Sequence, residues 1–95
     1  MVTKPATSTA LVAYRMAEIA IESGLLPKGS FTFIAGNPGD MLDHVDWQDV
    51  IAFTGSSDTG LMIRSRENIL AHNVRVNVEA DSLNAAVLGL SLIHI

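Results

Sequence analysis

One segment of the chain combines an apolar run, a turn of glycine and serine, and the beginning of a helical pattern. It reads Phe53-Thr54-Gly55-Ser56, and Thr59 follows within the predicted helix. Free backbone N–H groups at the beginning of a helix attract anions. Gly55 lets a phosphate approach the backbone, and the Ser56 hydroxyl can donate to it. The other interpretation is a plain turn in which Ser56 only caps the helix. No Walker or G-x-G-x-x-G spacing decides between the two.

A second candidate is the lysine in the turn Lys4-Pro5 near the start of the sequence. If residues 2–4 end a strand, Lys4 lies at the carboxyl end of that strand. Open α/β sheets bind their ligands in the crevice outside the carboxyl ends of the strands. Lys4 can then reach a ribose or a phosphate. The alternative is a solvated lysine ahead of a helix, which is how most lysines occur.

A third candidate is Glu79, the carboxylate that closes an alternating apolar segment. A carboxylate at such a strand end, partly removed from water, is suited to act as a general base. The alternative is an edge-strand glutamate that meets solvent, with Asp81 and Ser82 forming a turn. The histidines at 44, 72 and 94 have no metal-ligand spacing and no obvious partner. We therefore expect them to be surface or packing residues, and we expect no metal site.

The spacing of apolar residues predicts the elements that must position these candidates. Residues 7–23 and about 57–71 carry apolar side chains at helical spacing. Short apolar or alternating runs predict strands at 31–35, 49–53, 74–79 and 85–89. One helical turn is predicted at 40–44, and Trp47 is predicted to pack beneath the loop before the second of these strands. This alternation is typical of βαβ units, so the predicted fold class is α/β with a parallel sheet flanked by helices.

The composition limits the kinds of function. A chain of 95 residues that is 48% hydrophobic and 17% charged is not disordered. Its net charge of −4 disfavours non-specific binding to nucleic acid. Zero cysteines exclude a disulfide framework and a cysteine nucleophile within these residues. No apolar run approaches the roughly 20 residues of a membrane span, and no export signal is recognisable. We expect a cytoplasmic protein without a membrane partner.

Taken in order along the chain, these segments resemble the aldehyde dehydrogenase superfamily, specifically its cofactor-binding domain. The resemblance runs from Val2 to Gly89 and implies a partial Rossmann-like parallel sheet. The segments that carry it are Lys4-Pro5-Ala6, Glu22–Pro27 with Gly29, the loop through Gly39, Phe53–Ser56 with Gly60, and Glu79. The runs Gly39-Asp40, Leu42–His44, Gln48–Val50 and Glu79–Asn84 are most similar to one branch. That branch is the dehydrogenase half of the bifunctional ring-opening enzyme of phenylacetate degradation, which oxidises a CoA-linked semialdehyde.

The resemblance implies roles for individual residues. Lys4, with Ala6 and Thr7 beside it, would bind the adenosine ribose or its phosphate, and Gly39 would lie near the adenine. Glu79 would be the general base that activates water for thioester hydrolysis or primes the nucleophilic thiol. The pyrophosphate and nicotinamide side would be surrounded by Phe53, Thr54, Gly55, Ser56 and Thr59.

Two positions depart from the usual family pattern. Thr7 stands where many NAD-preferring members have a glutamate. Because a carboxylate at that place repels a 2′-phosphate, Thr7 implies NADP as well as NAD. The usual Glu-Leu-Gly-Gly run is here Glu79-Ala80-Asp81-Ser82.

The resemblance also implies that residues 1–89 are a fragment of that domain. The family's nucleophilic cysteine would lie past Ile95, and the asparagine of its oxyanion hole would lie before Met1. We therefore expect the chain alone to be inactive, and the parent, a homo-oligomer, to oxidise a small aldehyde to its acid with NAD or NADP. Residues Leu90–Ile95 are expected to be a non-native read-through tail; the alternative is an edge strand of an unusual relative. The rival functions are a stand-alone, non-catalytic nucleotide-binding module and an inert gene fragment.

Overall fold

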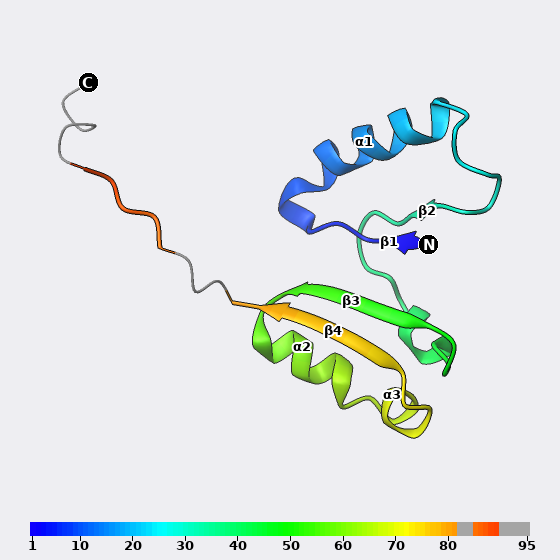
Figure 1. Ribbon diagram of the computed structural model, residues 1–95, viewed down its shortest axis with the longest axis vertical. Helices are drawn as coiled ribbons and strands as arrows, with labels where there is room; N and C mark the ends of the chain where they lie inside the picture. The colour runs from blue at the N-terminus through cyan, green and yellow to red at the C-terminus, as the bar shows by residue number, and fades with distance from the viewer. Residues whose placement is uncertain (82–84, 90–95) are drawn as a thin grey trace. The chain divides into compact units, whose positions relative to one another are not determined.

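The computed structural model describes residues 1–81 and 85–89, and it divides the chain into two compact units (Figure 1). The first unit comprises Met1–His44 and the second begins at Val45. Both contain parallel strands and helices, so the predicted α/β class is confirmed. The predicted tail, residues 90–95, lies outside the described residues, as do residues 82–84.

The first unit is a short parallel strand pair with one long helix. Strand β1 (Val2–Thr3) pairs with β2 (Thr32–Phe33). Between them lie a 3₁₀ turn, η1 (Thr7–Thr9), and helix α1 (Ala10–Glu22), and η2 (Met41–His44) ends the unit. The predicted helix therefore begins with a 3₁₀ turn. It ends where Ser23 and the left-handed Gly24 (φ 72°) close its last turn.

Helix α1 contacts its strand pair through few side chains. Ala17 is the buried residue of this helix, with 6% of its surface exposed. The rings of Tyr14 and Phe33 meet edge to face with their centroids 6.0 Å apart, a favoured aromatic geometry. Leu11 and Met16, by contrast, are exposed. The apolar character of α1 therefore extends well beyond the side that it buries.

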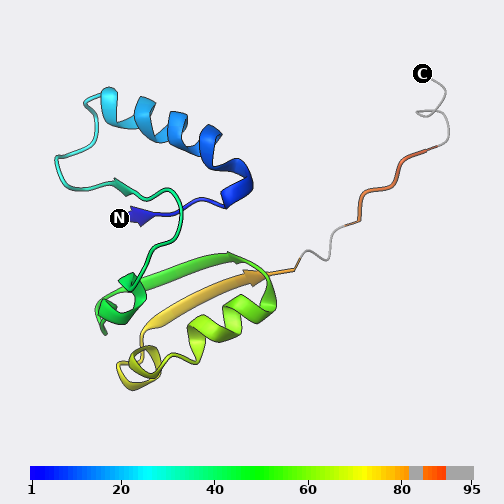
Figure 2. The same cartoon turned by 180° about the vertical axis from the view of Figure 1, so that it is seen from behind.

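The second unit is a βαβ arrangement that carries two of the predicted strands. Strand β3 (Val50–Gly55) pairs in parallel with β4 (Arg75–Ala80), from Val50 opposite Arg75 to Gly55 opposite Ala80. Helices α2 (Ser57–Arg64) and α3 (Glu67–Ala71) connect them. In Figures 1 and 2, α2 runs along the strand pair. The core of this unit is formed by Ile63, Ile69 and Val74.

The single helix predicted over 57–71 is wrong, because α2 and α3 are separate. Ser65 ends α2, and Arg66 is extended (ψ 140°) before α3 begins. Ile63 and Ile69 are six residues apart, about one and two-thirds turns of a continuous helix, which would point them in different directions. With the break, both are buried, at 8% and 3% exposed. Burial of both isoleucines favours the break over a continuous helix.

Two further predictions are corrected by the structure. Residues 85–89 form no strand, and they are exposed. A strand needs a hydrogen-bonded neighbour, and no described residue pairs with this segment. Trp47 does not pack beneath its loop but is 65% exposed. The loop is held instead by the Asn68 side-chain amide, which donates to the Val45 carbonyl at 3.0 Å. Within the described part of the chain, no helix is both long and apolar enough to span a membrane.

Candidate functional site

The carboxyl ends of β3 and β4 bring several of the predicted site residues together. The register places Thr54 opposite Glu79 and Gly55 opposite Ala80. Paired residues of neighbouring parallel strands lie about 4.8 Å apart and point to the same face of the sheet. The Asp81 N–H donates to the Gly55 carbonyl at 3.1 Å, one residue beyond the last pair. Glu79 therefore lies next to the turn that contains Gly55.

The serine at that turn caps the following helix. Ser56 is the N-cap of α2: its Oγ accepts from the Thr59 N–H at 3.2 Å and donates to the Thr59 Oγ1 at 3.0 Å. The hydroxyl thus performs the capping role that was the ordinary interpretation of this residue. An anion would have to be held mainly by the remaining N–H groups of the first turn. Asp58 in that turn adds a negative charge beside them.

Two glycines of this segment are required by close packing. A Cβ on Gly55 would lie 2.6 Å from the Phe53 Cζ, so the Phe53 ring covers the side of Gly55 where a side chain would project. A Cβ on Gly60 would lie 2.6 Å from the Val78 Cγ1, so α2 approaches β4 more closely than any side chain would allow. From the sequence, Gly55 was open to two interpretations, phosphate approach and a plain turn, and neither included the Phe53 ring. Gly60, four residues after the N-cap Ser56, could have indicated the close contact between α2 and β4, because a glycine inside a helix often marks close packing.

Glu79 lies on the open face of the strand pair. The residues at alternate positions of β3 and β4 are exposed on this face, among them Thr54, Asn77 and Glu79. The opposite face, with Phe53 and Val78, is half-buried on the side of α2. The removal from water that was predicted for Glu79 is therefore not provided by the described residues. This follows from the period of two in a strand, which places Glu79 opposite to the packed Val78.

The remaining predicted residues belong to the first unit. Lys4 follows β1, and its Nζ donates to the Pro5 carbonyl at 3.2 Å. Ala6 precedes η1 with an extended backbone, Thr7 opens η1, and both are exposed. Gly39 has a left-handed backbone (φ 62°), and its N–H donates to the Asn37 Oδ1 at 2.8 Å. Because β1 and β2 are parallel, Lys4 and the loop of Gly39 leave the same edge of this pair.

The histidines within the described residues have acidic partners, which corrects the expectation that they have none. The His44 Nε2 lies 3.2 Å from the Asp40 Oδ2, and the His72 Nδ1 lies 3.0 Å from the Asp46 Oδ1. The first pair has the i, i+4 spacing that a helical turn brings together, so the sequence contained this signal. His94 lies outside the described residues. Among the described residues, no three His, Cys, Asp or Glu side chains are grouped so that they could hold a metal ion.

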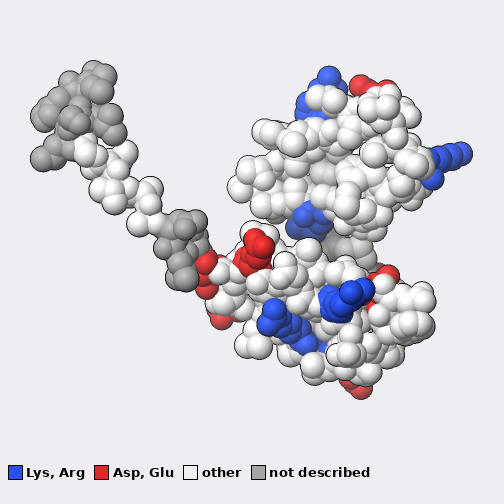
Figure 3. Space-filling model, in the orientation of Figure 1, with Lys and Arg blue, Asp and Glu red and all other residues white. Residues whose placement is uncertain are grey.

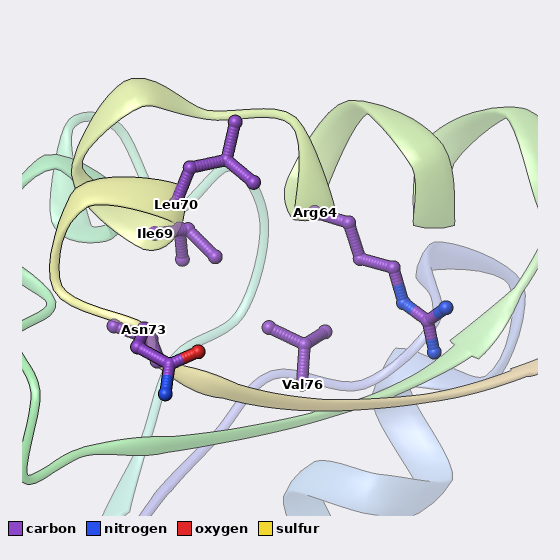
Figure 4. Close-up of a pocket in the computed structure, with 6 residues that line it drawn as sticks. Arg64, Ile69, Leu70, Asn73 and Val76 are labelled. Atoms are coloured by element: carbon purple, nitrogen blue, oxygen red, sulfur yellow. The ribbon is translucent and has the colours of Figure 1, made fainter.

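A shallow open depression of about 250 Å³ lies elsewhere on the second unit (Figure 4). Its lining residues come from the end of α2, from α3, from the turn that follows α3 and from the start of β4: Arg64, Ile69, Leu70, Asn73, Val74 and Val76. Glu79 stands near the other end of β4. The depression is therefore not part of the predicted site.

Comparisons with known proteins give the family. The aldehyde dehydrogenase family model matches residues 1–89. A 3,4-dehydroadipyl-CoA semialdehyde dehydrogenase of Aromatoleum evansii is 49% identical over 86 residues, which are 90% of this chain and 17% of that protein. A 1-pyrroline-5-carboxylate dehydrogenase of Oceanobacillus iheyensis is 42% identical over 66 residues, which are 66% of this chain and 13% of that protein.

The chain thus spans less than a fifth of the length of these relatives. The match over residues 1–89 includes every predicted site residue, from Lys4 to Glu79. Together with the parallel strands and the strand-to-helix turn, this match shows that the chain belongs to the aldehyde dehydrogenase family.

Proposed function

We propose that the chain is a part of an NAD(P)-dependent aldehyde dehydrogenase that oxidises an aldehyde to its carboxylic acid. The observation that carries the proposal is the family match over residues 1–89, which includes Glu79 beside the turn of Gly55. The Aromatoleum evansii relative is named for 3,4-dehydroadipyl-CoA semialdehyde. On that basis the proposed substrate class is a CoA-linked semialdehyde. This is also the substrate class of the family branch that the sequence resembles, the dehydrogenase half of the ring-opening enzyme of phenylacetate degradation.

Each unit, considered by itself, has residues at the carboxyl end of a strand that support binding of a nicotinamide dinucleotide. Aldehyde dehydrogenases generally use NAD(P), which accepts the hydride of the aldehyde. In the second unit, the β3–α2–α3–β4 arrangement is one βαβ unit, the kind of unit from which a mononucleotide-binding half is built, with its turn at the carboxyl edge. In the first unit, Lys4 offers a cation to the ribose or its phosphate. Thr7 places no carboxylate against a 2′-phosphate, which supports NADP beside NAD.

The proposed role of Glu79 is to accept a proton from the water molecule that hydrolyses the thioester formed on the family's cysteine. Its exposed position on the open sheet face leaves the carboxylate accessible to a water molecule and to substrate. A general base of this kind accelerates a reaction by about 10²- to 10⁴-fold. The chain contains no cysteine, so the nucleophilic thiol of the family must come from other residues of the enzyme. We therefore propose that the 95 residues alone do not oxidise aldehydes.

A hybrid enzyme tests this proposal. In the Aromatoleum evansii dehydrogenase, the 86 matched residues are replaced by those of this chain. We expect Glu79→Gln in this hybrid to lower kcat by about 10²- to 10⁴-fold, while the KM of the nucleotide changes little. Glu67→Gln, the same chemical change on the exposed first turn of α3, is the control.

Equal turnover of the hybrid and its Glu79→Gln variant would exclude the general base. A hybrid that binds nucleotide but never turns over would favour the non-catalytic nucleotide-binding module. Steady-state rates with NAD and with NADP, compared between the hybrid and its Thr7→Glu variant, decide which of the two nucleotides Thr7 favours.

A further inference from the structure

The residue that follows β4 has an unusual backbone. Asp81 has φ 48°, in the left-handed region that residues with a side chain seldom adopt. Its N–H nevertheless donates to the Gly55 carbonyl at 3.1 Å. In a parallel pair with Gly55 opposite Ala80, this is the next hydrogen bond of the ladder. Asp81 therefore completes the ladder with its N–H, while its own left-handed backbone departs from the extended conformation of a strand.

This bond lies just beyond the last residue pair of β3 and β4. Glu79 lies two residues before Asp81, opposite Thr54, and on the exposed face. The described residues provide no hydrogen bond or ion pair that fixes the Glu79 side chain. The position of the carboxylate thus depends on the strand backbone beneath it. The Asp81–Gly55 bond is the contact that holds that backbone to β3 beyond the last pair.

We propose that Asp81 is a positioning residue for Glu79. Its left-handed backbone ends β4 directly after Ala80 and keeps the last ladder bond to Gly55. It thereby holds the backbone of Glu79 beside Thr54 and the turn before α2, and so sets the place from which the carboxylate extends. The proposal rests on the proposed function in one respect, the role of Glu79 as general base. The placement of Glu79 by Asp81 is independent of that role and can be measured separately.

The other end of the same strand offers a matched control. Asn73, just before Val74 and β4, also has a left-handed backbone, with φ 50°. Aspartate and asparagine tolerate this conformation, whereas a β-branched residue in it is a rare exception. Asp81→Val and Asn73→Val therefore impose the same backbone conflict at opposite ends of β4. Asp81→Gly and Asp81→Asn retain a residue that accepts the left-handed conformation.

Nuclear magnetic resonance on the full 95-residue chain tests the placement without any reaction. We expect Asp81→Val to speed amide hydrogen exchange at residue 81 by about 5- to 30-fold, because the left-handed conformation becomes less populated. We also expect it to weaken the nuclear Overhauser contact between the Thr54 γ-methyl and the Glu79 γ-methylene. Asp81→Gly, Asp81→Asn and Asn73→Val should each keep that contact.

Three results would overturn the proposal. The first is an unchanged Thr54–Glu79 contact in Asp81→Val. The second is loss of that contact in Asn73→Val as well, because the effect would then come from general destabilisation. The third is loss of amide protection in Asp81→Val along the whole β3–β4 ladder, as far as Ile51, because Asp81 would then support the entire unit.

In the hybrid enzyme described above, the same variants separate positioning from folding. We expect Asp81→Val to lower kcat about 5- to 30-fold with the KM of the nucleotide nearly unchanged, and Asp81→Gly to restore kcat. An equal loss of kcat in Asn73→Val would contradict the proposal. If the hybrid has no dehydrogenase activity at all, the proposed function fails, and the resonance measurements on the chain still decide the role of Asp81.

Discussion

At the scale of single residues, the turn of the candidate site is made of small residues against which neighbouring side chains pack closely. Ser56 caps α2 through Thr59, and the Phe53 ring lies against Gly55. Gly60 allows α2 to approach Val78. Contacts within the protein are therefore sufficient to explain the conformation of the segment from Phe53 to Gly60, without a bound ligand. A substitution here changes stability first, and an effect on binding must be separated from that change.

The contact between Gly60 and Val78 gives the first stability prediction. Gly60→Ala puts a methyl group 2.6 Å from the Val78 Cγ1, so the helix must shift or the valine must move. We expect the free energy of unfolding to fall by about 1–3 kcal/mol, the usual cost of overpacking. Urea denaturation followed by circular dichroism measures it.

The double variant Gly60→Ala with Val78→Ala provides the control, because it removes the clashing methyl groups. The cost of the two changes together should then be less than the sum of the single costs. Strict additivity would show that the two side chains do not clash.

At the scale of elements, the break between α2 and α3 is the main departure from the pattern of the sequence. Ser65 closes α2, and the extended Arg66 lets α3 begin at Glu67 in a new direction. The break buries Ile63 and Ile69 together. It also shortens both helices, so their stability depends on packing against the strands more than on their own hydrogen bonds.

A proline at Glu67 tests this break. Glu67 is the first residue of α3, where a backbone N–H has no partner within the helix, and the preceding Arg66 is already extended. Proline is favoured at such a position. We therefore expect Glu67→Pro to change the free energy of unfolding by less than about 1 kcal/mol, or to raise it.

Met62→Pro, within α2 and at an exposed position, is the contrasting variant. It should cost about 3 kcal/mol or more, because a proline inside a helix removes a hydrogen bond and clashes with the preceding turn. Similar large losses in both variants, measured by urea denaturation, would show that residues 57–71 form one continuous helix.

At the scale of the whole molecule, the chain exposes much of its apolar surface. Among the described residues, the buried apolar side chains are Ala17, Ile63, Ile69 and Val74. Leu11, by contrast, is 88% exposed. In Figure 3 the basic and acidic side chains form separate clusters, with areas between them that carry neither. Exposed apolar surface of this extent is typical of a surface that is covered by other protein.

We therefore predict that the isolated chain self-associates as its concentration rises. The double variant Leu11→Gln with Met16→Gln replaces two exposed side chains of α1 and should weaken that association, with a change of less than about 0.5 kcal/mol in the free energy of unfolding. Sedimentation equilibrium over a range of concentrations measures the association. Glutamine at Ala17, which is buried, should instead destabilise the unit. A chain that stays monomeric at all concentrations would contradict the prediction.

The sequence by itself determined the properties that depend on neighbouring residues along the chain. Apolar spacing and turn residues predicted the parallel α/β class, one helical turn at 40–44 and the strands that became β3 and β4. In the structure that helical turn is the 3₁₀ turn Met41–His44. The order of the segments from Lys4 to Glu79 was sufficient to indicate the aldehyde dehydrogenase family, which the family match confirms. The roles of these residues in binding and catalysis stay predictions.

Only the tertiary structure decided the properties that depend on pairing across the chain. The strand register placed Glu79 beside Thr54, on the face away from α2, and the ladder bond of Asp81 reached back to Gly55. The break before Glu67 followed from the burial of two isoleucines, and residues 85–89 stayed without a strand because no described neighbour pairs with them. The spacing of apolar residues along the sequence indicates which side of a helix or strand is apolar. Which partner that side meets, and in which register, depends on contacts between residues far apart in the sequence.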